Sequence, residues 1–420
     1  MALLYASRSS RKATAGLVVR QLGRAAHLEF VDRAVGVVGV GVGVGGVAGG
    51  GSAVRSAVDS GAVGGIGVSF LQCPSWGAVK SGWDAESLGW YQGARLVGAG
   101  LVLYRWLPRV RRCLAYLPEG PMIDWFGERT GTEVAEWLGP LVEGLRRRGA
   151  FAVKLGPKVV SRIWSVATLK QAMAGGGQWR LGDVPADYVD ARADELSRRL
   201  RALGWRRARP GGDGFTDFQP RYLFRLPLAG RSEEQISAGF SQQWRRNIRL
   251  SQRADVHVAC VGRSWLPEFH RLYVETAARG WFTPRPLEYF QRMFDAFDEE
   301  DPQRIRLYIA RRGNEALAAA TMVRVGSYAW YSYGASANQG REYRPSNALQ
   351  WRMIQDCVAD GMNVYDLRGI GDSLDPAHHL YGLLRFKAGL GGEAVEYLGE
   401  WDYPINPVLY RAFQFYLARR

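Results

Sequence analysis

A Phe-Lys pair near the end of the chain is the first candidate for chemistry. Lys387 closes the segment 382–387, Gly-Leu-Leu-Arg-Phe-Lys, and it is one of only six lysines among 55 basic residues. After Lys170 it is the only lysine in the sequence. Lysine carries a compact charge on a flexible stem, whereas arginine carries a rigid planar fork. The pattern favours a point charge that stabilises a developing anion in a confined place, and the alternative is a surface lysine whose stem covers apolar surface.

The charge balance points to a polyanionic partner. The chain has 420 residues, with 55 basic and 40 acidic side chains, a formal net charge of +15 and a pI near 9.8. Nucleic acid, an anionic membrane surface or a phosphorylated substrate would each fit this excess. With 47% hydrophobic residues, the chain is long enough for two or three domains with cores of their own.

Metal and redox chemistry find no support in the sequence. The four cysteines are scattered singly, without the paired spacing of a zinc site or a redox motif. His378 and His379 are adjacent, but no cluster of other ligands surrounds them. We therefore expect no metal and no cofactor, and a protein of the reducing cytoplasm.

The first 67 residues divide into a tail and an insert. The tail, residues 1–33, lacks the apolar core of a secretory signal, and we expect a short amphipathic helix over its residues 17–33. Residues 34–54 carry no charge, but valine alternates there with glycine, and each glycine costs a helix about 1 kcal/mol relative to alanine. The composition is poor for a membrane-spanning helix and favours a flexible insert over residues 34–67.

The rest of the chain repeats one order of elements: three strands, a helix and a further strand. The first pass is predicted at residues 87–92, 95–106, 112–117, 134–145 and 151–155. The second pass is predicted at residues 305–310, 316–325, 327–333, 347–360 and 363–367, with Ser346 as the helix N-cap and Gly361 as its stop. The sequence thus predicts a mixed α/β (α+β) fold with two tandem domains.

Domain boundaries follow from this repeat. We expect a first domain over residues 68–229, closed by a strand at residues 222–226, and a second over residues 230–398. Additional helices are predicted at residues 189–203, 266–278 and 287–297. Residues 399–420 are expected to end in a helix that packs back on the first domain.

Three antiparallel strands, a helix and a following strand resemble the fold of the GNAT acyltransferases. In that family, a glycine-rich loop at the start of the helix binds the pyrophosphate of coenzyme A. The corresponding segments here are residues 130–133, Thr-Gly-Thr-Glu, and 344–347, Arg-Pro-Ser-Asn, which lack the required glycines. We therefore expect two GNAT-like domains whose acyl donor is not acyl-CoA.

Four motifs together resemble the FemABX family of non-ribosomal peptidyltransferases. They are residues 69–80 (Ser-Phe-Leu-Gln-Cys-Pro-Ser-Trp-Gly-Ala-Val-Lys), 117–121 (Leu-Pro-Glu-Gly-Pro), 365–369 (Tyr-Asp-Leu-Arg-Gly) and 382–387. The resemblance runs from about residue 69 to 405. It implies transfer of an amino acid, by family frequency glycine, from aminoacyl-tRNA to the stem peptide of a muramyl-pentapeptide precursor. It further implies a monomer in the cytoplasm, with peripheral contact to the inner membrane face as an option.

The resemblance gives roles to the Phe-Lys pair. Aminolysis of an ester needs a neutral amine placed against the carbonyl, stabilisation of the oxyanion and a route for the proton. By resemblance, Lys387 supplies the charge that meets the ester, and Phe386 stacks on the terminal adenine of the tRNA.

Other residues match the family's acceptor site. Lys80 corresponds to a lysine that contacts the precursor's pyrophosphate, and Arg285 with Tyr289 corresponds to an arginine and a tyrosine one helical turn apart. Their spacing of four predicts that Arg285 and Tyr289 share a helix face. Tyr331 and Tyr333 are predicted to share a strand face, and one of them matches a tyrosine in the acceptor cleft. The alternatives are an exposed arginine at a helix start and tyrosines of the core.

Two further features of the sequence, a cluster of arginines and Asp366, each allow two roles. The basic cluster of Arg245, Arg246 and Arg249 suits contact with a tRNA backbone, and the alternative is a solvated helix face. Asp366 is a candidate in the acceptor site, but its expected task is structural, orienting Arg368 or nearby backbone amides. The family often has an Asp-Pro pair where this chain has Gly156-Pro157, which puts a general base from the first domain in doubt.

The leading hypothesis is therefore an aminoacyl-tRNA-dependent peptidyltransferase acting on a cell-wall precursor. One alternative is the same transfer to an acceptor outside the cell wall. The other is a non-catalytic tRNA- or membrane-binding remnant of the fold.

Overall fold

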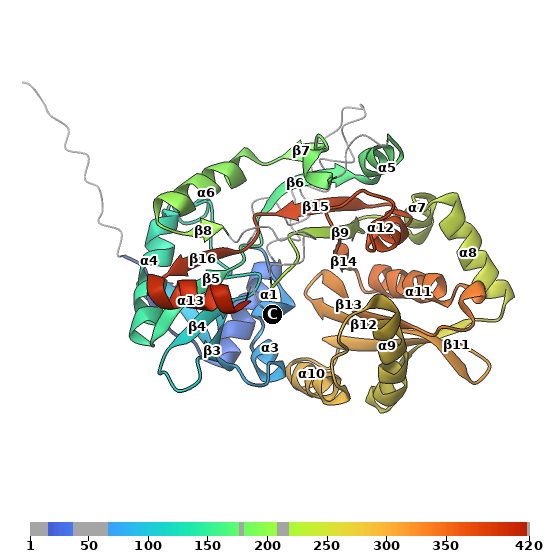
Figure 1. Ribbon diagram of the computed structural model, residues 1–420, viewed down its shortest axis with the longest axis horizontal. Helices are drawn as coiled ribbons and strands as arrows, with labels where there is room; N and C mark the ends of the chain where they lie inside the picture. The colour runs from blue at the N-terminus through green and yellow to red at the C-terminus, as the bar shows by residue number, and fades with distance from the viewer. Residues whose placement is uncertain (1–15, 37–65, 176–179, 208–217, 418–420) are drawn as a thin grey trace, which may run out of the picture.

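The computed structural model describes residues 16–36, 66–175, 180–207 and 218–417 (Figure 1). Residues 37–65, which are most of the predicted flexible insert, and residues 1–15 of the tail before it lie outside these ranges. Among the described residues, every helix falls short of the length and apolar character that a membrane crossing needs.

A first sheet is built mainly from the first half of the chain. In the described part it has seven strands in the order β1-β2-β3-β4-β5-β16-β8. The strands are β1 (Val18–Gln21), β2 (Asp84–Gln92), β3 (Arg95–Trp106), β4 (Cys113–Leu117), β5 (Ala150–Leu155), β8 (Arg206–Arg207) and β16 (Trp401–Pro404).

A second sheet is built mainly from the second half. Its nine described strands have the order β10-β11-β12-β13-β14-β9-β15-β6-β7. They are β6 (Val160–Ser165), β7 (Tyr188–Val189), β9 (Tyr222–Pro227), β10 (His257–Val261), β11 (Ile305–Arg312), β12 (Glu315–Val325), β13 (Tyr328–Ser336), β14 (Val364–Gly369) and β15 (Glu393–Tyr397).

The predicted repeat is confirmed. Antiparallel pairing joins β2, β3 and β4 in one sheet and β11, β12 and β13 in the other. In each sheet the strand after the helix then pairs in parallel, β5 with β4 and β14 with β13. The fold is therefore mixed α/β with two related sheets.

Helices cover the sheets on both sides. They are α1 (Arg24–Gly36), α3 (Pro74–Val79), α4 (Val134–Arg147), α5 (Val166–Gly175), α6 (Ala191–Ala202), α7 (Glu233–Ala238), α8 (Gln242–Arg253), α9 (Leu266–Gly280), α10 (Leu287–Glu300), α11 (Pro345–Ala359), α12 (Tyr381–Ala388) and α13 (Pro407–Leu417), with short 3-10 turns at Phe70–Gln72, Leu181–Asp183, Arg263–Trp265 and Arg341–Tyr343. The predicted apolar face of α4 is buried as expected. The predicted N-cap of α11 is wrong, because Arg344 in a left-handed conformation precedes Pro345 at the first helical position.

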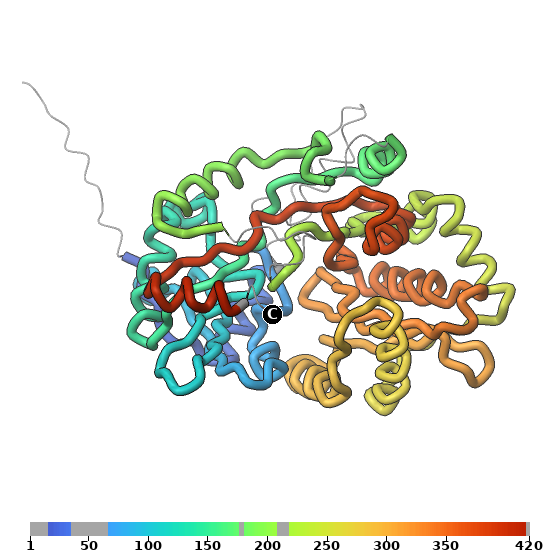
Figure 2. The backbone as a smooth tube through the Cα atoms, in the orientation of Figure 1, coloured from blue at the N-terminus to red at the C-terminus, as the bar shows by residue number. Residues whose placement is uncertain are grey.

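The two halves exchange strands. The predicted strand at residues 222–226 forms, as β9, but it pairs with β14 and β15 in the second sheet, so its expected place in the first domain is wrong. In return, the chain leaves β15 in the second sheet and enters β16 in the first, where it pairs with β5 (Figure 2). The domain boundary at residue 229 therefore stays a prediction drawn from the sequence repeat. Strands from each half of the chain join the sheet of the other half.

A shared apolar core joins the halves. It contains buried residues of α1, α3 and β3 from one side and of α9, α10, β11 and β12 from the other. Phe70 packs its ring against Trp330 at 5.2 Å between centroids, and Trp76 stacks on Phe297 at 6.3 Å. The region between the sheets is thus a packed seam, and the candidate site borders it.

Both ends of the described chain lie on the first sheet. The residues before α1 form β1, which pairs antiparallel with β2, so the expected helix begins later than predicted. The C-terminal helix α13 packs on β5 as predicted, with the rings of Phe413 and Phe151 at 5.5 Å.

Candidate active site

Lys387 is buried at the end of α12. Its residue surface is 3% exposed, and its Nζ donates to the carbonyl oxygens of Gly369 at 2.6 Å and Arg368 at 3.4 Å. Burial lowers the pKa of Lys387 to about 7, although the charge of Asp366 opposes this shift. The alternative of a surface lysine is therefore wrong, and the amine changes its protonation state near neutral pH.

The end of β14 is shaped to hold this lysine. Arg368 has a positive φ of 63° there, and its backbone N–H donates to Asp366 Oδ1 at 2.6 Å. Asp366 Oδ2 accepts a second bond from the Tyr328 hydroxyl at 2.9 Å. These bonds fix the turn that aims two carbonyl groups at Lys387. Asp366 is 1% exposed, so its contacts support the structural role expected for it.

A carboxylate from the other half of the molecule holds the Arg368 side chain. Glu119 follows β4, and its Oε1 accepts from Arg368 Nη1 at 2.7 Å while Ser69 donates to its Oε2 at 2.6 Å. Lys158 lies 3.8 Å from the same carboxylate. Burial disfavours the charged form of Glu119, but Arg368 and Lys158 outweigh this cost and hold its pKa below the usual value. Glu119 lies in the motif at residues 117–121, and no role for it was predicted from the sequence.

Glu119 lies beside the position of the missing acid. A Cβ placed on Gly156 would lie 3.4 Å from the backbone nitrogen of Glu119 and 3.6 Å from Cγ of Glu400. A small cavity of about 30 Å³ opens here, lined by both glutamates and Lys158. This volume suits a water molecule. Carboxylates therefore do reach this place, Glu119 from the first half of the chain and Glu400 from the residue before β16.

Three predicted residues meet in one cleft, which we call the cationic cleft. It has a volume of about 820 Å³ and is lined by Lys80, Arg105, Arg285 and Tyr289. Among the described residues that line it, none is acidic. Burial, followed by the nearby charge of Arg285, lowers the pKa of Lys80 to about 8. Like charges held together without a carboxylate favour an anionic ligand.

A tyrosine pair connects this cleft to the Lys387 region. The hydroxyls of Tyr289 and Tyr333 are hydrogen-bonded at 2.8 Å, and the guanidinium of Arg285 lies 5.4 Å from the Tyr289 ring centroid. Burial raises the pKa of Tyr333, while the charges of Arg285 and Arg368 oppose the shift. Tyr333 is therefore within electrostatic reach of both arginines.

Two details of the predicted acceptor site are wrong. Arg285 precedes α10 instead of lying on it, so it reaches Tyr289 from the preceding loop. Tyr331 and Tyr333 lie on opposite faces of β13, because a bulge opposite Thr321 and Met322 breaks the alternation. Tyr333 faces the shared core, and Tyr331 faces the core beneath α11. Tyr333 is thus the tyrosine that meets Tyr289.

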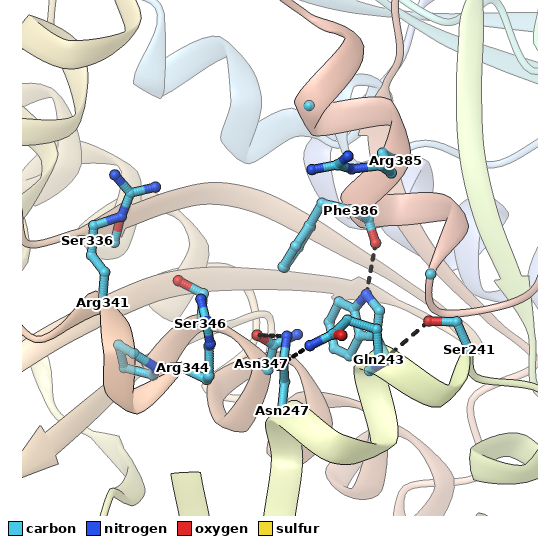
Figure 3. Close-up of a pocket in the computed structure, with 14 residues that line it drawn as sticks. Ser241, Gln243, Asn247, Ser336, Arg341, Arg344, Ser346, Asn347, Arg385 and Phe386 are labelled. Carbon is cyan, nitrogen blue, oxygen red and sulfur yellow. Dashed lines mark hydrogen bonds between the residues drawn. The ribbon is translucent and has the colours of Figure 1, made fainter. Parts of the chain in front are cut away.

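A second cleft, which we call the arginine pocket, lies on the other side of α12. Figure 3 shows Arg341, Arg344, Arg385 and Phe386 around it. Its volume is about 720 Å³, and among the described residues that line it none is acidic. It opens at the start of α11, where Arg341 and Arg344 precede the helix.

Trp244 and Phe386 form the aromatic side of the arginine pocket. Their ring centroids are 4.8 Å apart, and Trp244 Nε1 donates to the Phe386 carbonyl at 2.9 Å. A Cβ on Gly389 would lie 2.1 Å from the Trp244 ring, so glycine is required there. The packing of Trp244 gives no local signal in the sequence.

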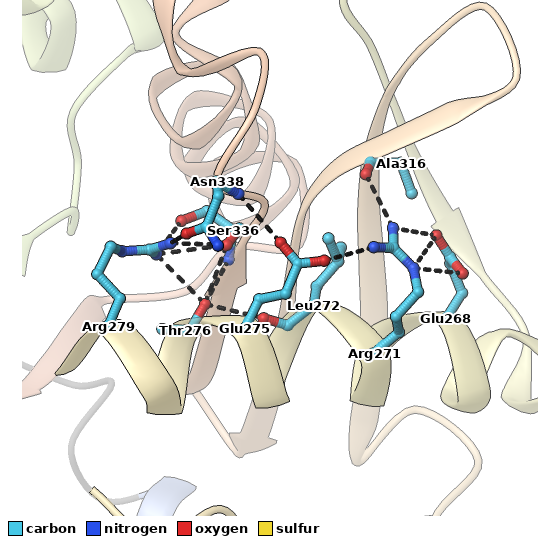
Figure 4. Close-up of polar contacts among 9 residues, drawn as sticks. All are labelled: Glu268, Arg271, Leu272, Glu275, Thr276, Arg279, Ala316, Ser336 and Asn338. Atoms are coloured by element: carbon cyan, nitrogen blue, oxygen red, sulfur yellow. Dashed lines mark hydrogen bonds and ion pairs between the residues drawn. The ribbon is translucent and has the colours of Figure 1, made fainter. Parts of the chain in front are cut away.

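A polar network fixes one edge of the arginine pocket. Figure 4 shows α9 bonded to the end of β13 through Thr276 and Arg279. Thr276 Oγ1 accepts from Ser336 N at 2.8 Å, and Arg279 donates to Ser336 Oγ at 2.8 Å. Ser336 lines the pocket, so α9 holds this edge in place.

The predicted tRNA-binding arginines lie on α8 beside the arginine pocket. Arg246 and Arg249 are exposed, whereas Arg245 donates to the carbonyls of Ala238 and Phe240. Other residues of α8, Trp244 and Asn247, line the pocket itself.

Comparison with known proteins shows the family to which the chain belongs. The model of the FemAB family matches residues 67–311 and 301–417. The chain belongs to the FemAB family. It is 23% identical to the lipid II:glycine glycyltransferase of Staphylococcus haemolyticus (strain JCSC1435) over 415 residues, which cover 82% of this chain and 90% of that protein. The corresponding protein of Staphylococcus aureus (strain MRSA252) is 22% identical with the same coverage.

The fold comparison agrees with the family. The crystal structure of FemX superposes with a TM-score of 0.71 at 19% sequence identity, covering 94% of this chain and 99% of that one. The FemABX resemblance found in the motifs is therefore confirmed.

The buried position of Lys387 predicts a pH-dependent stability. Its folded pKa is about 7, below the unfolded value near 10.5, so the unfolded state binds more protons between these values and stability rises with pH across this window. We expect the unfolding free energy of the wild type, minus that of Lys387→Met, to rise by about 2 kcal/mol between pH 7 and pH 9. Urea unfolding at both values measures it, and an unchanged difference would contradict the burial of a charged amine.

The Glu119 contact predicts a large loss of stability on neutralisation. Glu119→Gln leaves Arg368 and Lys158 without their shared counter-charge, and we expect a loss of roughly 3 kcal/mol. Glu299→Gln is the control, because it breaks an exposed pair with Arg24 and should cost less than about 1 kcal/mol. Equal losses in urea unfolding would refute a special role for Glu119.

Proposed function

We propose that this FemAB-family protein transfers an amino acid from aminoacyl-tRNA to the stem-peptide amine of a peptidoglycan precursor. The observation that carries the proposal is a buried lysine on α12, whose neighbours Arg385 and Phe386 line the arginine pocket, in a molecule whose second cleft is lined by Lys80 and Arg285. The relatives named lipid II:glycine glycyltransferase support glycine as the amino acid and a lipid-linked precursor as the acceptor. We propose that it acts as a monomer at the cytoplasmic face of the membrane.

The arginine pocket suits the end of the tRNA. Phe386 and Trp244 offer aromatic surface for the terminal base, and Arg341, Arg344 and Arg385 offer partners for its phosphates. The exposed arginines of α8 lie where the acceptor arm could continue, so binding should weaken steeply with salt.

The cationic cleft suits the acceptor. Lys80 and Arg285 repel one another in the empty cleft, and a pyrophosphate between them would relieve this repulsion. Tyr289 and Tyr333 then lead from the pyrophosphate site toward Arg368 and Lys387.

Lys387 has one donor to spare for the reaction. An ammonium carries three N–H donors, and the carbonyls of Gly369 and Arg368 occupy two of them. The third can stabilise the oxyanion that forms when the acceptor amine attacks the ester. The new amide bond forms as the ester bond to the ribose oxygen breaks. Lys387 gives a proton to that oxygen and regains one from the attacking amine, so the step is balanced.

A transfer assay tests the proposal. Wild-type protein with [14C]glycyl-tRNA and lipid-linked or nucleotide-linked precursor should yield labelled precursor, visible also as a mass shift. We expect Lys387→Met to lower kcat at least 100-fold, and the exposed Lys170→Met to leave it unchanged. Absence of label on every muramyl-peptide tested would refute the cell-wall function.

The acceptor site gives a different kinetic signature. Lys80→Ala and Arg285→Ala should raise the KM for the precursor about tenfold each while changing kcat little, because they remove binding contacts remote from the ester. Arg95→Ala, an exposed arginine outside the cleft, is the matched control. An unaltered KM in both cleft variants would argue against a pyrophosphate site there.

A further inference from the structure

The C-terminal helix α13 is apolar on both of its faces. Leu409 and Phe413 pack toward Phe151 of the first sheet. Val408 and Phe415 are seven residues apart, two helical turns, and they are 76% and 58% exposed. Large apolar side chains that are exposed together on one helix face can mark an interaction site, so the outer face of α13, which also carries Arg411, is a candidate docking surface.

The loop between β3 and β4 extends this surface. Trp106 and Val110 are 39% and 48% exposed, and Leu107 packs in the same small apolar cluster as the inner residues of α13. We call the exposed apolar residues of both segments the apolar rim: Trp106, Val110, Val408, Phe415 and Tyr416. The rim borders the cationic cleft, because Trp106 and Tyr416 also line that cleft.

Basic residues surround the rim. Arg109, Arg111 and Arg112 are exposed in the loop, and Arg411 is exposed on α13. Asp84 places a carboxylate beside the rim, where it accepts from Trp106 Nε1 at 2.7 Å, and the buried Asp402 accepts from the Tyr410 hydroxyl of α13 at 2.8 Å. Aromatic side chains flanked by arginines are the composition that binds the interface of an anionic bilayer. A second copy fits less well, because a two-fold contact would bring these arginines against each other.

We propose that the apolar rim docks on an anionic membrane surface and holds the cationic cleft over the lipid headgroups. This inference rests on the proposed function, and it deepens it by naming where a lipid-linked acceptor enters. The pyrophosphate of such an acceptor reaches Lys80 and Arg285, while its lipid chain stays in the bilayer. The geometry thus favours a lipid-linked over a nucleotide-linked precursor.

Vesicle binding tests the rim directly. The full chain should co-sediment with phosphatidylcholine vesicles containing 25% phosphatidylglycerol, and binding should fall with added salt. We expect Val408→Ser with Phe415→Ser to weaken binding at least tenfold. The control is Val189→Ser with Val274→Ser, which replaces two exposed valines away from the rim and should bind like the wild type. Equal binding by both double variants would overturn the proposal.

A second variant and two further measurements keep the test decisive. Arg109→Ser with Arg111→Ser should lose binding to the anionic vesicles while thermal unfolding stays unchanged. Sedimentation velocity reports self-association, and a wild-type dimer that Val408→Ser with Phe415→Ser dissociates would overturn the membrane assignment in favour of a second copy.

Transfer assays separate this inference from the function on which it rests. The Val408→Ser, Phe415→Ser protein should transfer to nucleotide-linked precursor in solution at the wild-type rate, and to lipid-linked precursor in vesicles at a rate at least tenfold lower. If the double variant transferred to both substrates at the wild-type rate, the proposed docking surface would be wrong, while the transferase function would stand. A wild-type protein inactive on both would instead refute the proposed function.

Discussion

The ion pair between Glu119 and Arg368 is the contact on which the candidate site depends. Arg368 lies in a strand of the second sheet and Glu119 follows a strand of the first, and their side chains, 18% and 13% exposed, meet at 2.7 Å. Burying charges is costly unless each finds a partner with good geometry. Here the pair draws in Ser69 and Lys158, and it fixes the Arg368 side chain at the point where its backbone carbonyl, with that of Gly369, receives Lys387. A contact between the halves thus controls the environment of the Lys387 amine.

Strand exchange makes this contact rigid. Since β9 belongs to the second sheet and β16 to the first, neither sheet is complete without chain from the other half. The shared core around Phe70 and Trp330 adds apolar packing to the same seam. Arg368 also lies 5.5 Å from the Phe70 ring centroid, so the apolar and ionic contacts are adjacent. The fold therefore presents its two clefts and Lys387 in a fixed relation, which suits a reaction that depends on positioning.

Local patterns in the sequence predicted the repeat and the helix faces, because periodicity reports which side of an element is buried. They failed where pairing between distant segments determines which sheet a strand joins and which way a side chain faces. The strand at residues 222–227 has no local feature that assigns it to one sheet. The bulge in β13 puts Tyr331 and Tyr333 on opposite faces of the strand, and the sequence pattern gives no sign of it. Glu119 escaped notice for the same reason: only the fold brings it beside Gly156 and Arg368. Lys387, which composition singled out, is buried at the end of α12, and its role in catalysis stays a prediction.

The most direct test of the account is the pKa of Lys387 itself. With only six lysines in the chain, a protein labelled with 13C at the lysine ε-carbons gives a simple NMR spectrum, and Lys387→Met assigns the signal. The account predicts that this signal titrates near pH 7 and that Glu119→Gln changes its midpoint, because the charges around Arg368 are altered. A midpoint near 10 that is indifferent to Glu119→Gln would show that Lys387 is an ordinary solvated lysine and contradict the account.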